Sequence, residues 1–353
     1  MNSRKLSQEA IELLKTLIAT QSFSGEEKLT AKAIAGWFEA HEIPYHQQGN
    51  NIYALNEDFD QGKPTLLLNS HHDTVKPNAA YTKDPFEPVI EDGKLYGLGS
   101  NDAGGCLVSL IVLFTYFYKR KQLKYNLVIV ASAEEENSGS NGLNSVLPNL
   151  PPIDVAIVGE PTQMQLAVAE KGLLVLDCYA QGTAGHAAHG VGENAIYKAM
   201  EAIRWFQTFS FPRVSPTLGK IKMTVTQVNA GSQHNVIPAE CHFVVDIRIT
   251  DQYSNVEVLA LVKSQVDVVV KERSLRLNSS AIPMNHDLVK AGVALGRETY
   301  GSPTLSDQAV LSCPSLKMGP GDSLRSHTAN EFIYLHEINE GIQLYIDLLE
   351  KVL

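Results

Sequence analysis

Cysteine is scarce in this 353-residue chain, and long apolar runs are absent. The four cysteines, Cys106, Cys178, Cys241 and Cys313, lie far apart and form no CxxC pair. This argues against a cysteine zinc site or a disulfide framework and favours reduced thiols in the cytoplasm. No run approaches the roughly 20 apolar residues of a membrane span. The amino terminus also lacks the pattern of a secretory signal. The sequence therefore predicts a cytoplasmic protein with no membrane partner.

Basic residues are also in short supply, because 29 Lys and Arg face 39 Asp and Glu, a formal net charge of -10. Phosphate binding needs a basic face, and no block of Lys and Arg occurs, which argues against a nucleic-acid partner. The length exceeds what one hydrophobic core usually organises, so two domains are expected.

The first half of the chain alternates helical and strand patterns. Helices are expected at residues 6–20, after Ser24 and at residues 106–121, the last being apolar enough to be buried. Short apolar runs at residues 65–70, 126–132 and 155–159 are typical of buried strands. This alternation predicts an α/β domain with a mostly parallel sheet and helices on both faces.

Near Lys171 the pattern changes to strands that alternate apolar and polar residues, as in an antiparallel sheet with one solvated face. With helices near residues 194–209 and 255–272, this segment predicts a smaller α+β, ferredoxin-like unit. We therefore expect a catalytic domain at residues 1–167 and 281–353, and an inserted domain at residues 168–280.

Several of the apolar strands end at a histidine or a carboxylate. His71 and Asp73 follow the first strand, Glu134 and Glu135 the second, and Glu160 the third. The carboxyl ends of strands are where ligands bind in open α/β sheets. Asp73 is spaced to accept the far N–H of a metal-bound His71 ring and so fix its tautomer.

Asp102 lies in a small-residue loop, GLGSNDAGG, and its two oxygens are able to bridge two cations. With Asp102 shared, His71 and Glu160 would complete one metal site, and Glu135 and His327 the other. This mixed nitrogen and oxygen set suits zinc, cobalt or manganese.

Glu134 is then free to act as general base toward water. Taken alone, the Glu134–Glu136 run is more typical of a solvated helix start, and His327 of a surface loop. Their joint occurrence at strand ends favours the metal site.

Five sequence blocks, in order from residue 70 to 331, resemble one known family: SHHDTVKP, YGLGSNDAGG, SAEEENSGS, VGEPT and GPGDSLRSHTANE. This is the co-catalytic zinc aminoacylase/peptidase family, which contains acetylornithine deacetylase, succinyl-diaminopimelate desuccinylase and glutamate carboxypeptidase. The resemblance implies the same ligand roles, Glu134 as base, and a cis peptide bond at Asp102-Ala103. One departure is Ala133, which replaces the first acid of the family's Asp-Glu-Glu block.

The resemblance also implies that the inserted domain is a lid that mediates homodimerisation and contacts the substrate. His186, acting from the partner subunit, would stabilise the oxyanion, and Asn235 and Arg248 would hold the substrate carboxylate, for which an arginine fork is suited. From the residues alone, His186 could equally be a structural loop histidine and Arg248 a solvent-facing strand residue. In residues 304–308, Ser306 or Asp307 is a candidate for substrate contact.

The reaction expected is amide hydrolysis with two divalent metal ions, for which zinc is expected. Among the family's branches, the resemblance points to removal of an N-acetyl or N-succinyl group from ornithine or a related amino acid, in arginine biosynthesis. Succinyl-diaminopimelate desuccinylase and a di- or tripeptidase stay open as alternatives. A catalytically silent binding protein and a two-metal phosphodiesterase are rivals that the sequence disfavours.

Overall fold

The computed structural model describes residues 3–353, and it divides into two compact units. The first unit comprises residues up to Val168, Ala281–Tyr300 and Ser306–Leu353, and the second comprises Ala169–Ser280 and Gly301–Leu305. Residues 301–305 were expected in the first domain and belong to the second unit, whereas Val168, expected in the inserted domain, belongs to the first.

The first unit is built on one mixed sheet. Its strands, in spatial order, are β1 (His46–Gln48), β2 (Asn51–Leu55), β6 (Asn126–Ser132), β3 (Thr65–His71), β7 (Val155–Val158), β17 (Ser315–Lys317), β8 (Leu166–Glu170) and β15 (Ser280–Ala281), and β16 (Thr299–Ser302) pairs with β8. The central strands β6, β3, β7 and β17 are parallel, while β2 and β8 join them antiparallel. The α/β class expected from the sequence is confirmed.

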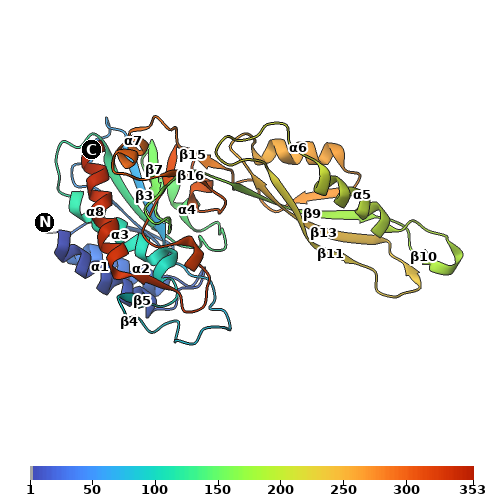
Figure 1. Cartoon of the computed structure of the whole chain (residues 1–353), viewed down its shortest axis with the longest axis horizontal. Helices are drawn as coiled ribbons and strands as arrows, with labels where there is room; N and C mark the ends of the chain where they lie inside the picture. The colour runs from blue at the N-terminus through green and yellow to red at the C-terminus, as the bar shows by residue number, and fades with distance from the viewer. Residues whose placement is uncertain (1–2) are drawn as a thin grey trace. The chain divides into compact units, whose positions relative to one another are not determined.

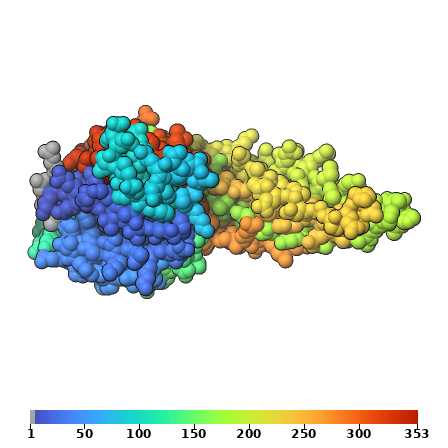
Figure 2. Space-filling model, turned by 90° about the horizontal axis from the view of Figure 1, so that it is seen from below, coloured from blue at the N-terminus to red at the C-terminus, as the bar shows by residue number. Residues whose placement is uncertain are grey.

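Helices cover both faces of this sheet unequally (Figure 1). The larger hydrophobic cluster contains residues from α1 (Ser3–Ile18), α2 (Lys28–Ala40), α3 (Gly105–Phe117), α7 (Asp287–Ala294) and α8 (Leu335–Val352). A smaller cluster contains α4 (Leu143–Val146). Because side chains alternate along a strand, Leu66 and Leu68 of β3 enter the larger cluster and Leu67 enters the smaller one. Helices α1 and α8 contact each other, and Figure 2 shows the blue N-terminal and red C-terminal segments side by side.

Helix α3 is the central helix of the larger cluster. The stretch Ser100–Phe117 is long and apolar enough to cross a membrane, which the sequence analysis had not noted, but 89% of it is buried inside the unit. A helix that is hydrophobic on all sides is expected in the core of a large domain. Its contacts with α1, α8, β3 and β6 satisfy that apolar surface within the first unit.

Two smaller features complete the description of the first unit. A three-stranded antiparallel sheet is formed by β18 (Phe332–Tyr334), β5 (Lys94–Tyr96) and β4 (Val89–Glu91). The loops after β3, β6 and β7 leave the parallel strands at one edge of the large sheet, because parallel strands all end on the same side.

The second unit is an antiparallel sheet with two helices. Its elements are β9 (Gly172–Gln181), β10 (Gly185–His186), α5 (Ala195–Thr208), β11 (Lys222–Ala230), β12 (Val236–Ile237), β13 (Glu240–Ile249), α6 (Asn255–Gln265) and β14 (Val269–Glu272). The four-stranded sheet has the order β11-β13-β9-β14, and β10 pairs with β12 separately. Alternate residues of β9 are buried against the helices, as the period-two pattern predicted. The β-α-β-β-α-β order is that of a ferredoxin-like unit.

The polar face of this sheet carries a charge cluster centred on Asp177. Its carboxylate accepts hydrogen bonds from Arg273 at 2.8 and 3.0 Å and lies 2.9 Å from His242 Nε2. The hydrogen bonds from Arg273, and then from His242, lower the pKa of Asp177 to about 2.

We expect Asp177→Asn to destabilise the second unit by about 1 kcal/mol at pH 7, after allowing for solvent screening of the exposed Arg273. The folded-state pKa lies below the unfolded value of about 3.9. The pair therefore stabilises the fold above about pH 4. That contribution is lost as the pH falls through 2. Urea unfolding of the wild type and the variant between pH 7 and pH 2 measures the difference, which should shrink with acidification; a constant difference would contradict this origin.

Candidate functional site

His71, at the end of β3, is the centre of a buried cluster of carboxylates. Its Nδ1 donates to the backbone oxygen of Asp73 at 3.0 Å, which leaves Nε2 as the other ring nitrogen. That Nε2 is buried and has no hydrogen-bond partner. It faces three carboxylate oxygens, from Asp102 at 3.4 Å, Glu135 at 3.8 Å and Glu160 at 3.8 Å.

These spacings fit ligands around a divalent metal ion. Distances of 3.4–3.8 Å are too long for hydrogen bonds from a ring nitrogen. A tetrahedral ion with bonds of about 2.1 Å separates its ligand atoms by about 3.4 Å. A buried imidazole nitrogen without a partner, surrounded by oxygens at this spacing, is therefore suited to a metal, and His71, Glu135 and Glu160 form one candidate group.

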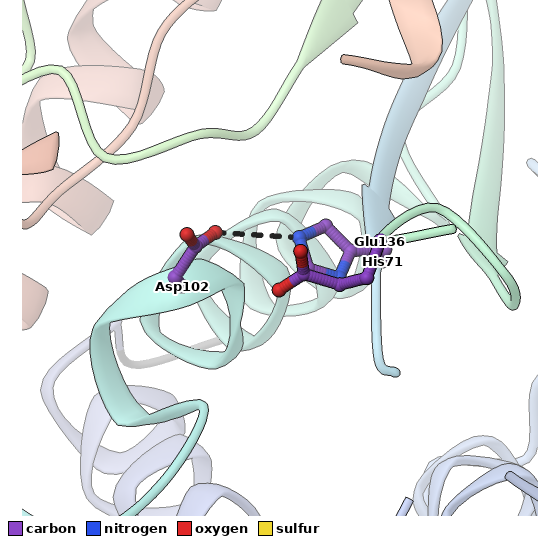
Figure 3. A group of neighbouring side chains, drawn as sticks. All are labelled: His71, Asp102 and Glu136. Carbon is purple, nitrogen blue, oxygen red and sulfur yellow. Dashed lines mark ion pairs between the residues drawn. The ribbon is translucent and has the colours of Figure 1, made fainter. Parts of the chain in front are cut away.

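A second candidate group shares His71 with the first and adds Asp102 and Glu136. Figure 3 shows Asp102, at the start of the helical segment before α3, with its carboxylate oxygen directed to the ring of His71. The two oxygens of Asp102 face different histidines, Oδ1 toward His71 at 3.4 Å and Oδ2 toward His327 at 3.6 Å. His327 Nε2 lies 3.0 Å from Glu136. One carboxylate between two histidines is the geometry that a bridging ligand requires.

Asp73 holds the backbone of the glutamate block as well as the imidazole. Its Oδ1 accepts from the backbone N–H of Glu135 at 3.0 Å, and its Oδ2 from that of Glu136 at 3.1 Å and from Ser24 Oγ at 2.7 Å. Burial opposes ionisation of Asp73, but the hydrogen bond and charge of His71, together with the hydrogen bonds from Ser24 and the Glu135 N–H, outweigh it and lower the pKa of the carboxyl. Asp73 thus fixes the relative positions of His71, through its backbone oxygen, and of two glutamates, through its carboxylate.

The glutamate block differs from the arrangement expected from the sequence. Glu134 was expected to act as base and Glu135 to lie with His327, but the carboxylate at His327 belongs to Glu136. The Glu134 carboxylate instead accepts from the backbone N–H and side-chain amide of Asn141, at 3.1 and 2.9 Å. Among the described residues, no ion pair joins it to the histidine cluster.

The physical reason is a left-handed turn of the backbone at Glu134, where φ is 54°. After this turn, the consecutive N–H groups of Glu135 and Glu136 both bind Asp73. Their carboxylates then join the two candidate metal groups. The sequence did contain one sign that the roles shift by one residue, because Glu136 is a third acid in the run. A strand pattern that ends at Ala133 does not predict where the side chain of Glu136 points.

The cluster brings several carboxylates close together, and their mutual repulsion is not balanced by positive charge within the cluster. Burial, and then repulsion from Glu160, Asp307 and Glu136, raises the pKa of Glu135 well above its usual range, although His71 opposes this. Hydrogen bonding to Glu136 raises the pKa of His327 to about 9. Divalent cations placed among these oxygens would relieve the repulsion.

A further carboxylate, Asp307, lies behind the glutamate block. Its Oδ2 accepts from Ser132 Oγ at 2.5 Å, and Ser132 accepts from Asn69 Nδ2 at 3.0 Å. Burial raises the pKa of Asp307 to about 6 against the opposing hydrogen bond from Ser132. Because Ser132 ends β6, this network ties residues 304–308, considered from sequence for substrate contact, to the strand that carries the glutamates.

The Asp102-Ala103 peptide bond is cis, as the family resemblance implied. His72, next to His71, takes no part in the cluster. Its ring is hydrogen-bonded to Thr30 Oγ1 at 2.9 Å and to the backbone oxygen of Asn50 at 3.0 Å. Burial lowers the pKa of His72 to about 4, so it is a neutral core residue.

Three of the residues expected to contact substrate, His186, Asn235 and Arg248, lie in the second unit. His186 is exposed on β10, opposite Val236 of β12, and the backbone oxygen of Asn235 accepts from Ala187 at 3.0 Å. His186 and Asn235 are therefore neighbours, although 49 positions separate them in the chain. Arg248 makes a two-bond pair with Asp246 on the same strand, at 2.9 and 3.1 Å.

A mixed α/β sheet whose parallel strands end at histidine and carboxylate side chains suited to metal ligation is the arrangement of a metal-dependent hydrolase. The chain belongs to peptidase family M20/M25/M40, whose family model matches residues 67–351. The match includes every residue of the cluster built on His71.

Similar proteins include deacetylases and peptidases. Acetylornithine deacetylase from Shigella sonnei is 28% identical, with 96% of each chain covered. An M20 family metallo-carboxypeptidase from Sulfolobus solfataricus superposes with a TM-score of 0.76 at 15% identity, covering 98% of this chain and 99% of that one. A dinuclear metal-binding M20 peptidase from Bacillus subtilis superposes with a TM-score of 0.73 at 16% identity, covering 98% of each.

Proposed function

We propose that the protein is a two-metal amidohydrolase that removes a short N-acyl group, acetyl or succinyl, from ornithine or a related amino acid in arginine biosynthesis. The observation that carries the two-metal part is Asp102, whose two oxygens face His71 and His327 separately. The similarity to acetylornithine deacetylase over 96% of both chains supports the deacylase part.

In this proposal Asp102 would contribute one oxygen to each ion. His71 and Glu160 would complete one site, and Glu136 and His327 would complete the other. A set of imidazoles and carboxylates suits zinc, with cobalt or manganese as alternatives. When bound, the metals supply a Lewis acid that polarises the amide carbonyl and favours ionisation of the attacking water.

Glu135 is our candidate for the general base, in place of Glu134. The backbone N–H of Glu135 donates to the Asp73 carboxylate, which fixes the position of the residue. The carboxylate of Glu135 lies inside the cluster, 3.8 Å from His71 Nε2. It would take the proton from water and return it to the leaving amine. In the metal-free cluster, burial and then repulsion from neighbouring carboxylates raise its pKa.

The second unit would supply the substrate contacts and a homodimer interface. His186 would stabilise the oxyanion from the partner subunit, while Asn235 and Arg248 would hold the substrate carboxylate. Strand β11 is at the edge of its sheet, so one side of its backbone is available for pairing. Helix α5 beside it exposes Tyr197 and Met200, and β11 exposes Val228, which supports association of this face. The free cysteines support a cytoplasmic location.

Two alternatives use the same site. One is a succinyl-diaminopimelate desuccinylase, and the other is a di- or tripeptidase. The metallo-carboxypeptidase among the similar folds supports the peptidase alternative. The proposed reaction and both alternatives hydrolyse a linear amide, so the metal site does not distinguish among them. The pockets for the acyl group and the amino acid determine which substrate is cleaved.

The test is hydrolysis of a substrate panel by protein loaded with zinc or cobalt. The panel contains N-acetylornithine, N-succinylornithine, N-acetylcitrulline, N-succinyl-diaminopimelate and a dipeptide. We expect one N-acyl derivative of ornithine or citrulline to be cleaved with a kcat/KM at least tenfold above the rest. Preferred cleavage of the dipeptide would replace the deacylase by the peptidase alternative.

A further inference from the structure

We propose that Glu331 is a positioning residue that fixes the loop of Asp102 against the loop of His327 and thereby sets the spacing of the second metal site. This inference rests on the two-metal site of the proposed function. It concerns a residue that binds neither metal nor substrate in that function.

Glu331 holds the Asp102 loop through three backbone N–H groups. Its Oε1 accepts from the N–H of Asn101 at 2.8 Å and of Asp102 at 2.9 Å, and its Oε2 accepts from that of Gly99 at 3.1 Å. Its backbone oxygen also accepts from Gly97 at 3.0 Å. The side chain is 2% exposed, so these bonds are not exchanged for water. A carboxylate that accepts several backbone N–H bonds is a strong and directional restraint.

The other end of the His327 loop is tied to the same segment. Asn101 Nδ2 donates to the backbone oxygen of Asp322 at 3.1 Å, and Asn101 Oδ1 accepts from the Asp322 N–H at 2.9 Å. The loop from Asp322 to Glu331 is thus anchored at both ends to residues 97–102. His327 lies between the anchors, with a left-handed φ of 59° and its Nε2 3.6 Å from Asp102.

Burying the charged carboxylate of Glu331 costs free energy. We therefore infer that this carboxylate is retained because it positions the two loops. No ion pair is seen for Glu331 in residues 3–353, and its carboxylate is compensated by the N–H groups alone. A neutral glutamine of the same shape would turn an NH₂ group toward at least one of the N–H donors, and two donors repel.

The first test uses Glu331→Gln, with Asp154→Asn as the matched control. Asp154 also accepts a backbone N–H, from Thr65 at 2.7 Å, but at the opposite end of β3 from His71. Metal-free proteins are titrated with Co²⁺, and the visible absorption band reports the coordination of each equivalent. We expect Glu331→Gln to bind the second equivalent about 10- to 100-fold more weakly with an altered band, while the control matches the wild type.

Kinetics on the substrate identified by the panel add a second readout. We expect the kcat of Glu331→Gln to fall about 10- to 100-fold with KM changed less than about threefold, because the restraint acts on the metal site and not on substrate contacts. Should Glu331→Gln fail to fold, Asn101→Ala removes the other anchor and carries the same expectation.

Amide hydrogen exchange of the metal-free proteins separates this inference from the proposed function. Glu331→Gln should speed exchange in both residues 97–104 and residues 322–330, whereas Asp154→Asn should leave both slow. If the wild type binds fewer than two Co²⁺, the proposed two-metal function is wrong. The hydrogen-exchange result then tests by itself whether Glu331 couples the two loops. Unchanged exchange, or unchanged binding of a second Co²⁺, in Glu331→Gln would overturn the role of Glu331.

Discussion

Replacing Glu135 by glutamine is expected to lower kcat by about 10²- to 10⁴-fold while both metals stay bound. General acid–base catalysis contributes an effect of this size, and glutamine keeps the shape of the side chain but cannot accept the proton. The backbone N–H bond from residue 135 to Asp73 does not involve the side chain, so the loop should keep its position. Steady-state kinetics together with metal analysis of the purified variant measure both quantities.

Glu134→Gln is the matched control, since it changes the neighbouring glutamate in the same way. Its carboxylate is bound by Asn141 and has no described ion pair with the histidine cluster, so kcat should stay within a few-fold of the wild type. The reverse result, a silent Glu134→Gln and an active Glu135→Gln, would restore the roles expected from sequence alone. It would also imply that the loop rearranges when the metals bind.

Asp102→Asn is expected to reduce the metal content more than Glu135→Gln does. An amide offers one neutral oxygen where the carboxylate offers two charged ones, so one side of the bridge is lost. We expect the variant to retain at most one metal per chain after dialysis and to lose more than about 10³-fold in kcat, the scale of a metal's contribution to water activation. Atomic absorption and kinetics at fixed free zinc measure the two effects.

A stoichiometry of two metals in Asp102→Asn would contradict the bridging role. Asn101→Asp is not a suitable control, because Asn101 anchors the neighbouring loop. Asp92→Asn is better suited, since Asp92 lies in the exposed turn between β4 and β5 and should keep both metals and full activity.

The sequence determined the class of fold because burial and periodicity are local properties. The runs before His71, Glu134 and Glu160 became β3, β6 and β7, and the alternation after Lys171 became an antiparallel sheet. The same reasoning placed His71 and Glu160 at the ends of β3 and β7, and His71 lies close to Glu160 and to Asp102, whose other oxygen faces His327. The fold class, the enzyme class and the family followed from these patterns and blocks.

The directions of the side chains of Glu134, Glu135 and Glu136 were set only by the tertiary structure. Three identical side chains in a row carry no sequence signal for their directions, and the left-handed turn at Glu134 depends on Asp73, which is distant in the chain. The role of Glu331 could not be predicted from the sequence either, because its carboxylate binds three backbone N–H groups that lie more than 200 residues away in the chain. Strand patterns fix which residues are buried or lie at a sheet edge, whereas side-chain direction within a loop is set by long-range hydrogen bonds that form only when the chain is folded.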